Sequence, residues 1–468
     1  MGLARLTGGH SSGYKGRDVN TGSQGRRQRS AGGEMRVLIV SHMHPRVSRG
    51  GGEIAAYQMY ETLRETAGVK AFFLAASGGK LFAPLGAPIF QPFTEDEFVA
   101  SSDGYDYFSH SNPNPSFPKH FADLLLRIRP DVIHFHHYVN FGVEVFAHVR
   151  RLLPQVRIVV TLHEYLLICN HFGQMVKRPS FALCEAASAR DCARCFPEKT
   201  ENDFFMRELF LRRFLEDVDQ FISPSHFLAN RYIAWGLPAD RMEVIENGIP
   251  PLPQPARPMP PVESGLVIGF FGQISRLKGV PVLGRAAQQI AMDARFDQPM
   301  RIEIHGDASN QPAEIKAELE TPEGSQRSII TMCGPYQHSN VHRLMQACHA
   351  VIVPSVWWEN SPLVIQEAFL NRRPVICSDI GGMAEKVRNG LDGFHFRAGS
   401  SMELADLLMR LARNPERVLA LQETLAVPPS LVETTGMTMA IYRKLLAALR
   451  PVAKPAAGKA AVPAEPVA

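Results

Sequence analysis

Long hydrophobic runs are missing from this sequence of 468 residues. No apolar segment approaches the roughly 18 residues that a membrane-spanning helix needs, so we expect no part of the chain to cross a bilayer. Residues 1–34 also lack the apolar core of a secretory signal peptide and are rich in glycine, serine and arginine instead. We expect residues 1–34 to be a disordered extension and Met35, which opens a strand-like run, to be the functional start.

Residues 35–468 have no excess of positive or negative charge. The formal net charge is +4. Residues 1–34 hold six basic and two acidic residues, which accounts for the whole excess, so residues 35–468 are formally neutral. This composition gives no reason to expect a nucleic-acid partner.

Cysteine is sparse, with seven residues, and the odd number without a signal peptide indicates a reducing, cytoplasmic compartment. Four of the cysteines fall within one short segment: Cys169, Cys184, Cys192 and Cys195. The Cys192-x-x-Cys195 spacing is that of a zinc hairpin, with Cys169 and Cys184 as the other two thiolates of a structural site. Ordinary free thiols are the alternative.

Short apolar runs rich in β-branched residues alternate with longer helical patterns, which predicts an α/β protein with parallel sheets. The predicted strands of the first half are residues 36–41, 70–77, 131–137, 157–163, 220–225 and 242–248. Those of the second half are residues 266–272, 301–306, 328–334, 350–355, 374–379 and 393–396.

A proline-rich stretch, residues 251–264, separates the two series of strands and is predicted to be a linker. The domains on either side are then residues 35–250 and 265–430. A C-terminal helix is predicted at 431–450 and a solvated tail at 451–468. Because ligands of such sheets bind beyond the carboxyl ends of the strands, we expect the site in the cleft between the domains.

The segment "PSVWWENSPLVIQEAF", residues 354–369, combines a strand end with a helix start. Ser361 is a good N-cap, and Pro362 suits the first helical position. The amides near Leu363 and Val364 then carry the positive end of the helix dipole and are suited to bind phosphate.

Two carboxylates flank this helix start. Glu359 lies in the loop before it, and Glu367 lies more than a turn inside, where its carboxylate can accept hydrogen bonds from a ribose. Taken alone, the two glutamates are better explained as a solvated loop charge and a surface residue of the helix, and only the surrounding motifs favour a functional role.

The order of several motifs resembles the family-4 retaining glycosyltransferases, which have the GT-B fold of two facing Rossmann-like domains. The motifs are the Glu359 and Glu367 pair, Pro374-Val375, and the loop Gly381-Gly382-Met383-Ala384-Glu385. The resemblance covers roughly residues 36 to 445. It implies that the first domain binds the acceptor and the second binds a nucleotide sugar.

The resemblance also assigns residues in both domains. Gly50 and Gly51 match a glycine loop that lets amides approach a diphosphate. No G-x-G-x-x-G follows that strand, so it is not a dinucleotide fingerprint. Lys278 matches the lysine that neutralises the leaving diphosphate, and Arg276 is expected to replace an arginine that the family often has at Gln273. His163 matches a histidine beside the donor sugar.

The catalytic residues implied are therefore His163, Lys278 and Glu359. Those implied for donor binding are Gly50, Gly51, Arg276, Lys278, Ser361, Leu363, Val364 and Glu367. The family lacks a required metal, and no Asp-x-Asp motif is placed here to hold one. His134, His136 and His137 are interpreted as structural or acceptor-side residues rather than metal ligands.

The implied function is transfer of a sugar from a UDP- or GDP-linked donor to a glycan or lipid-linked acceptor, in polysaccharide or glycolipid synthesis. Alternatives are a sugar-nucleotide epimerase, which the loop pattern disfavours, and a non-catalytic scaffold. The helical pattern at residues 203–217 fits either a core helix or one that rests on the inner face of the membrane. The base, the sugar and the acceptor are not identified by the sequence.

Overall fold

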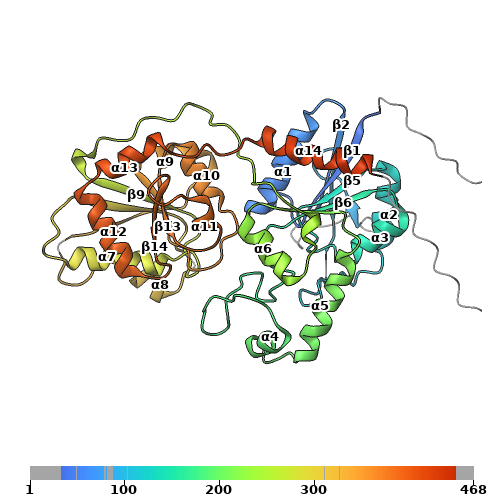
Figure 1. Cartoon of the computed structure of the whole chain (residues 1–468), viewed down its shortest axis with the longest axis horizontal. Coiled ribbons are helices and arrows are strands. Elements are labelled where there is room, and N and C mark those ends of the chain that lie inside the picture. Colours follow the sequence, from blue (N-terminus) through green and yellow to red (C-terminus); the bar gives the residue numbers. More distant parts are fainter. Residues whose placement is uncertain are drawn as a thin grey trace, which may run out of the picture. The chain divides into compact units, whose positions relative to one another are not determined.

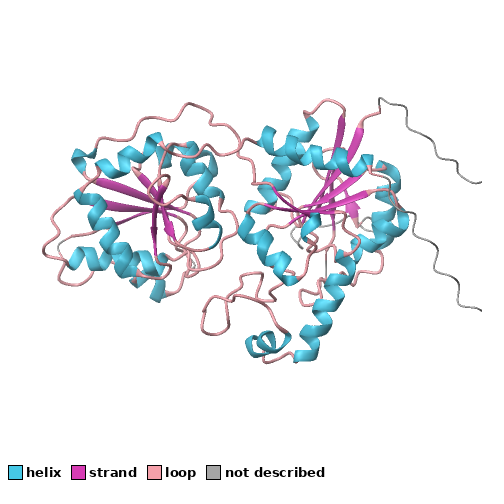
Figure 2. Ribbon diagram, in the orientation of Figure 1, coloured by secondary structure: helices cyan, strands magenta, loops and turns pink. Residues whose placement is uncertain are grey.

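Two sheets dominate the computed structural model, which describes residues 33–48, 50–77, 81, 88–102, 104–309, 311–325 and 327–448. The predicted extension, residues 1–34, lies almost entirely outside the described residues, and the predicted tail lies entirely outside them. Figure 1 shows the arrangement of the elements, and Figure 2 shows helices on both sides of each sheet.

The first sheet has the order β3-β4-β2-β1-β5-β6-β7-β8, and only the β3–β4 pair is antiparallel among its described pairs. Its strands are β1 (Met35–Ser41), β2 (Val69–Ala76), β3 (Ile89–Phe90), β4 (Glu97–Ala100), β5 (Val132–Phe135), β6 (Arg157–Thr161), β7 (Gln220–Ser223) and β8 (Met242–Val244).

The second sheet is parallel and has the order β11-β10-β9-β12-β13-β14. Its strands are β9 (Leu266–Phe271), β10 (Met300–His305), β11 (Ile330–Gly334), β12 (Ala350–Val353), β13 (Val375–Ser378) and β14 (Gly393–Phe396).

Helices follow most strands and cover the sheet faces. Those of the first half are α1 (Gly51–Arg64), α2 (Phe117–Ile128), α3 (Glu144–Leu152), α4 (Ala189–Cys195), α5 (Glu201–Leu215) and α6 (His226–Trp235). Those of the second half are α7 (Val280–Met292), α8 (Ala313–Ala317), α9 (Val341–Gln346), α10 (Leu363–Leu370), α11 (Gly381–Lys386), α12 (Ser401–Arg413), α13 (Glu416–Ala420) and α14 (Leu431–Ala447). None of the described helices is both long and apolar enough to cross a membrane.

The predicted fold class is confirmed, because both series of strands form mainly parallel sheets of an α/β protein. Two strands, β3 and β4, were not predicted. β4 begins with Glu97, whose carboxylate is buried and lies 3.0 Å from Nε2 of His44. A charged residue at the start of a four-residue run conceals a buried strand, because the side chain that hydrogen-bonds its carboxylate is distant in sequence.

Side chains of the central strand β1 alternate between two cores, as the period of two along a strand requires. Leu38 and Val40 pack into the core that α2 and α3 cover. Val37 and Ile39 pack into the core on the other face, which contains residues of α1 and α14. The first sheet is therefore buried on both faces, which explains its nearly continuous apolar strands.

Helix α14 follows the second sheet in sequence but packs on the first (Figure 1). It begins with a capping box of Ser430 and Glu433. Tyr442 of this helix is fully buried, and its hydroxyl lies 2.6 Å from Nδ1 of His134 at the centre of the first sheet. Helix α14 is thereby tied to the first domain.

Replacing Tyr442 with phenylalanine should destabilise the protein. The Tyr442→Phe change keeps the ring but leaves His134 Nδ1 buried without its partner, which costs about 1–2 kcal/mol. Thermal unfolding should show a lower midpoint, whereas Met437→Ala, at an exposed position of the same helix, should leave the midpoint nearly unchanged. Equal midpoints for the two variants would show that the buried contact contributes nothing.

Candidate functional site

A cavity of about 310 Å³ opens where loops of the two sheets meet. Both sheets belong to one compact unit of the chain. From the first half, the cavity is lined by Gly51, Gly52, His163 and Asn247. From the second half, it is lined by Phe270, Phe271, Gly272, Lys278, Ile352, Val353, Ser355, Glu359, Asn360, Ser361, Pro362, Leu363 and Val364.

Two helix N-termini meet at this cavity. Helix α1 begins at Gly51, directly after the loop that follows β1, and α10 begins at Leu363, after the loop that follows β12. A Cβ added at Gly51 would lie 3.7 Å from Cδ1 of Leu363, so the two helix starts are in contact distance of each other. The first amides of a helix have no intrahelical acceptor, so both ends present positive dipole charge to the same space.

The predicted cap of α10 is wrong by one residue. Pro362 occupies the N-cap position with extended backbone, and no side chain caps the helix. The hydroxyl of Ser361 is buried without a hydrogen-bond partner and belongs to a residue that lines the cavity. Because proline fixes φ near its helical value, it can hold the entrance of the helix without help from Ser361.

Lys278 and Glu359 form an ion pair inside the cavity. Nζ of Lys278 lies 2.6 Å from Oε1 of Glu359. The same carboxylate oxygen accepts hydrogen bonds from Oγ of Ser355 at 2.8 Å and from Nε1 of Trp357 at 2.9 Å. The Glu359 side chain is 6% exposed, and three donors fix its orientation.

The environment of Glu359 keeps its carboxylate ionised. Burial by itself would raise the pKa, but the charge of Lys278 and the hydrogen bonds from Lys278, Ser355 and Trp357 together lower it. Because His163 stays neutral through burial, with a pKa lowered to about 3, Lys278 is the one cationic side chain at neutral pH among the described residues that line the cavity.

Two glycines let the loops around this pair approach each other. Gly279 has a φ of 73°, and a Cβ there would lie 1.7 Å from the carbonyl oxygen of Pro354, so only glycine allows Lys278 to sit beside the end of β12. Gly382 donates its amide to the carbonyl of Glu359 at 2.7 Å, and a Cβ on it would meet the carbonyl of Asn360. The Gly381-Gly382 loop thus fixes the backbone of Glu359 through this hydrogen bond.

Glu367 lies on α10 outside the lining of the cavity. Its Oε1 lies 3.6 Å from Nε2 of His338, and its side chain is 13% exposed. Burial raises the pKa of this carboxyl to about 7. Ionised Glu367 therefore carries an energetic cost in the absence of a ligand that donates hydrogen bonds to it.

His163 follows β6 and lies, half-buried, beside a cluster of buried histidines. Its Nε2 lies 2.9 Å from Nδ1 of His136, and the rings of His136 and His137 stack on it. His134 bonds Tyr442 and Thr161. Among the described residues, these histidines do not form a group with metal-ligand spacing.

Besides Glu367, two further predicted donor-binding residues, Gly50 and Arg276, do not reach the cavity lining. Gly50 is the N-cap of α1, directly before the lining residue Gly51. The guanidinium of Arg276 lies over the ring of Phe181, 4.8 Å from its centroid, and lines a separate hollow. Arg276 thus contacts the segment that follows β6, through Phe181, and not the cavity.

Direct contacts tie the two sides of the cavity together. Nδ2 of Asn360 donates to the carbonyl oxygen of His163. The carboxylate of Glu385 accepts the backbone amides of His226 at 2.8 Å and Phe227 at 2.6 Å, and so caps the start of α6 from the opposite half. The Gly-Gly-x-x-Glu loop therefore supports Glu359 with its glycine and holds the first domain with its glutamate.

The four cysteines of the predicted zinc site lie in the segment between β6 and α5 and are all free. Cys192 and Cys195 lie on α4, and Sγ of Cys195 accepts the amide of Arg178 at 3.1 Å. In the part of the chain that the structure describes, no three of these sulfur atoms lie within 4.8 Å of one another. Zinc thiolates stand about 4 Å apart, so these thiols do not form a zinc tetrahedron as placed, and zinc binding here remains a prediction.

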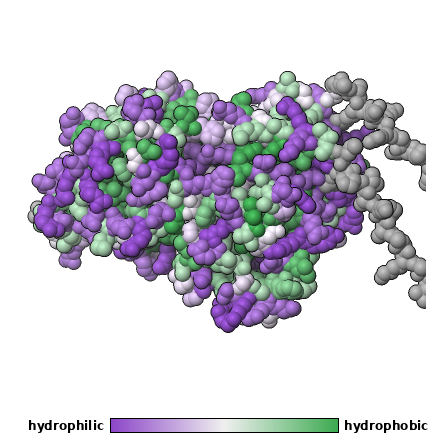
Figure 3. Space-filling model, in the orientation of Figure 1, coloured by the Kyte–Doolittle hydropathy of each residue, from purple (hydrophilic) through white to green (hydrophobic). Residues whose placement is uncertain are grey.

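Helix α5 was predicted to be either a core helix or a helix that rests on a membrane. It has buried residues, which fit the first prediction, and exposed apolar residues, which fit the second. Arg207 is buried and donates to the carbonyls of Phe108, Leu166 and Leu167, so this arginine is part of the protein interior. The exposed apolar residues of this helix are Phe205, Met206 and Leu209. Hydrophobic residues accordingly reach the surface over α5 (Figure 3).

Several residues of the site were not found from the sequence. Ser355 and Trp357 hold Glu359, and Asn360 crosses to the other half. A usable signal was present, since all three stand in the loop after a buried strand, where parallel sheets place their functional residues. Their individual partners depend on contacts between segments that are distant in sequence.

The chain matches the models of two known glycosyltransferase domains. Residues 49–251 match the model of "Glycosyltransferase Family 4", and residues 265–414 match that of "Glycosyl transferases group 1". The chain therefore belongs to the family-4, group-1 glycosyltransferases, as the motifs predicted.

Individual relatives are distant. A D-inositol 3-phosphate glycosyltransferase of Corynebacterium aurimucosum is 29% identical over 34% of this chain and 37% of its own length. The chain thus matches less than half the length of that relative.

Solved structures show the same GT-B arrangement at low identity. HepE of Anabaena, solved with UDP and glucose, has a TM-score of 0.61 at 18% identity, over 88% of this chain and all of its own. Sucrose-phosphate synthase of Thermosynechococcus elongatus has a TM-score of 0.63 at 16% identity, again over 88% of this chain and all of its own.

The raised pKa of Glu367 predicts a stability that depends on pH. The folded protein holds this proton up to about pH 7, whereas the unfolded chain releases it near the ordinary value of 4.5, so ionisation opposes folding as the pH rises between these values. The stability of the wild type relative to Glu367→Gln should fall from pH 5 to pH 8 by roughly 1–3 kcal/mol.

Denaturant unfolding at several pH values measures this difference. The control is Glu423→Gln, because the Glu423 side chain is 83% exposed and keeps its hydration. A difference between wild type and Glu367→Gln that stays constant across this pH range would contradict the raised pKa.

Proposed function

We propose that this protein transfers a sugar from a nucleoside-diphosphate donor to a hydroxyl acceptor with retention of anomeric configuration. The observation that carries the proposal is the convergence of two helix N-termini and one lysine on a single cavity between two α/β domains. Cleavage of such a donor develops negative charge on a diphosphate, and this arrangement offers positive charge where it develops.

The diphosphate would lie between the start of α10 and Lys278. The amides near Leu363 and Val364 and the unpartnered hydroxyl of Ser361 would bond its oxygens. Lys278 already shares one N–H with Glu359, and an ammonium group has three donors, so it can contact phosphate without leaving the carboxylate. Gly51 would bring the amides of α1 close to the same group.

Glu359 would position hydroxyl groups of the donor sugar and stabilise the positive charge that develops on its ring. One of its oxygens is held by three donors, which leaves the other for the sugar. The departing phosphate would help to take the proton from the acceptor hydroxyl, so no side chain need act as a nucleophile and no metal is required. Neutral His163 would form a hydrogen bond with a hydroxyl of the donor sugar.

Glu367 would accept hydrogen bonds from the ribose of the donor. Its elevated pKa fits this role, because two hydroxyl donors would stabilise an anion that the empty site disfavours. Donor binding near pH 7 would then release a proton from this carboxyl.

The donor is proposed to carry UDP or GDP, and the acceptor to be a glycan or a lipid-linked sugar of a polysaccharide or glycolipid. The Anabaena neighbour was solved with UDP and glucose, which supports a uridine donor. A cytoplasmic location fits the free cysteines. The exposed apolar residues of α5 would serve peripheral contact with the inner face of a membrane.

Replacing Lys278 should abolish most of the activity. Lys278→Ala removes the one cationic side chain of the cavity lining, so turnover with the preferred donor should fall by about 100-fold or more. The measurement is product formation and nucleoside-diphosphate release across a panel of UDP- and GDP-sugars. Lys316→Ala, an exposed lysine of the same domain, is the matched control and should keep wild-type rates.

The same panel distinguishes catalysis from scaffolding. A non-catalytic scaffold would show a melting temperature raised by UDP or GDP but no turnover by the wild type. Wild-type turnover that survives in Lys278→Ala would contradict the role given to the lysine, and interconversion of free sugar nucleotides would indicate an epimerase.

Donor binding should also change the protonation of Glu367. Calorimetric titration with the tightest-binding nucleotide at pH 7, in buffers of different ionisation enthalpy, should show net proton release. Glu367→Gln should lose this release and bind more weakly, because a carboxamide does not titrate near pH 7 and accepts weaker hydrogen bonds from hydroxyls than a carboxylate does. Unchanged proton release in the variant would place the titrating group elsewhere.

A further inference from the structure

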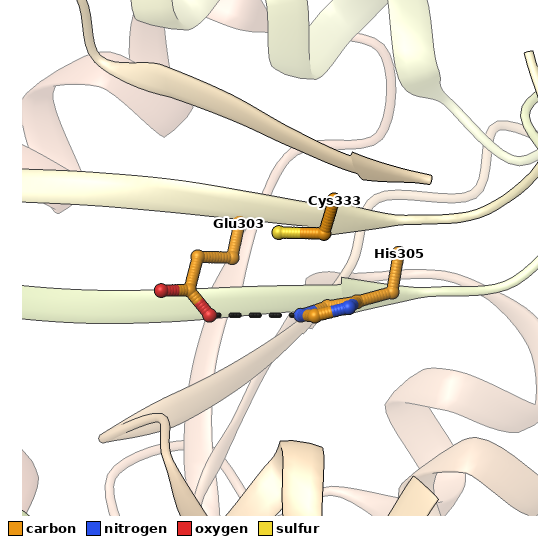
Figure 4. A group of neighbouring side chains, drawn as sticks. All are labelled: Glu303, His305 and Cys333. Atoms are coloured by element: carbon orange, nitrogen blue, oxygen red, sulfur yellow. Dashed lines mark ion pairs between the residues drawn. The ribbon is translucent and has the colours of Figure 1, made fainter. Parts of the chain in front are cut away.

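The second sheet carries a group of metal-binding side chains away from the cavity lining. Ligand atoms of Glu303, His305 and Cys333 lie within 4.8 Å of one another, and this is the one such group among the described residues. Figure 4 shows the three side chains on the adjacent strands β10 and β11, with the carboxylate of Glu303 facing the imidazole of His305.

The local strand geometry brings the three residues together. Glu303 and His305 are two positions apart on β10, so they point to the same face of the sheet. The register with β11 shifts between Ile304 and His305, and Cys333 is the residue left without a partner there. This bulge places an extra side chain beside the pair, and bulges commonly redirect side chains in this way.

His305 has an unsatisfied nitrogen that faces the group. The residue is 4% exposed, and its Nε2 has no hydrogen-bond partner. The nearest carboxylate oxygen, Oε2 of Glu303, lies 3.6 Å away, beyond hydrogen-bond range. The imidazole lies parallel to Phe271, with ring centroids 4.6 Å apart, and this stacking fixes the plane of the ring.

We propose that Glu303, His305 and Cys333 bind a zinc ion. An imidazole nitrogen, a thiolate and a carboxylate are the ligand types that zinc takes, whereas calcium and magnesium prefer oxygen ligands alone. One oxygen of Glu303 is held by Nε of Arg301 at 2.8 Å, which leaves the other for the metal. Cys333 is exposed and gives the ion access from solvent; it would lose its thiol proton on binding, and water would complete the coordination.

The proposed zinc does not depend on the proposed transferase activity. Zinc would, however, help to hold one lining residue of the cavity in place, because the imidazole of His305 stacks on Phe271 and Phe271 lines the cavity. The site is distinct from the four cysteines between β6 and α5, which contribute no ligand to it.

The test is metal binding by the full chain after treatment with chelator and dialysis. Zinc affinity is measured by competition with a chromophoric chelator, and Co²⁺ is used as a spectroscopic probe, because thiolate coordination gives it an intense charge-transfer absorption. Cys333→Ser and Glu303→Gln are conservative changes at partly accessible positions and should each weaken zinc binding by roughly tenfold or more. Cys333→Ser should also remove the thiolate absorption of the cobalt form.

A double variant, Cys192→Ser with Cys195→Ser, separates this site from the cysteine-rich segment. Under the proposal it still binds one zinc ion with wild-type affinity at the Glu303 site, and zinc still raises its melting temperature. Zinc binding that is lost only in this double variant would overturn the proposal. So would wild-type affinity in Cys333→Ser, or a wild type that binds no zinc at micromolar concentration.

Discussion

The buried ion pair of Lys278 and Glu359 is the constraint around which the rest of the site is built. A carboxylate that is 6% exposed is costly unless its charge is compensated, and here one ammonium and two neutral donors compensate it. The lysine follows β9 and the glutamate follows β12, neighbouring strands of the second sheet. Their pairing therefore requires both loops to close over the carboxyl ends of these strands, and Gly279 makes this closure sterically possible.

Charge in the cavity is distributed unevenly, which favours an anionic ligand with hydroxyl groups. The ion pair is neutral as a whole, so the remaining positive potential comes from the amides at the starts of α1 and α10. The histidines beside them are kept neutral by burial and provide hydrogen bonds without adding charge. Glu367, with its raised pKa, is the group whose charge a ligand would change most easily.

Closure of the site depends on contacts that cross between the halves of the chain. Glu385 caps α6, Asn360 reaches the carbonyl of His163, and α14 returns from the second sheet to bury Tyr442 in the first domain. Glu385 and Asn360 contact backbone groups of the first half, whereas Tyr442 contacts the side chain of His134.

The sequence by itself determined the two α/β domains, twelve of the fourteen strands that the structure describes, and the family, because buried strands and glycine loops leave strong local patterns. The motifs that resemble the family also singled out Lys278 and Glu359, and the structure places both of them at the cavity. Only the tertiary structure decided that Ser361 is not the helix cap, that Arg276 stacks on Phe181 and that Glu367 stands outside the cavity lining. It also brought Cys333 to His305. The reason is physical: the partner, burial and charge of a side chain depend on segments that are distant in the sequence. A local sequence pattern does not show which of these segments will contact that side chain.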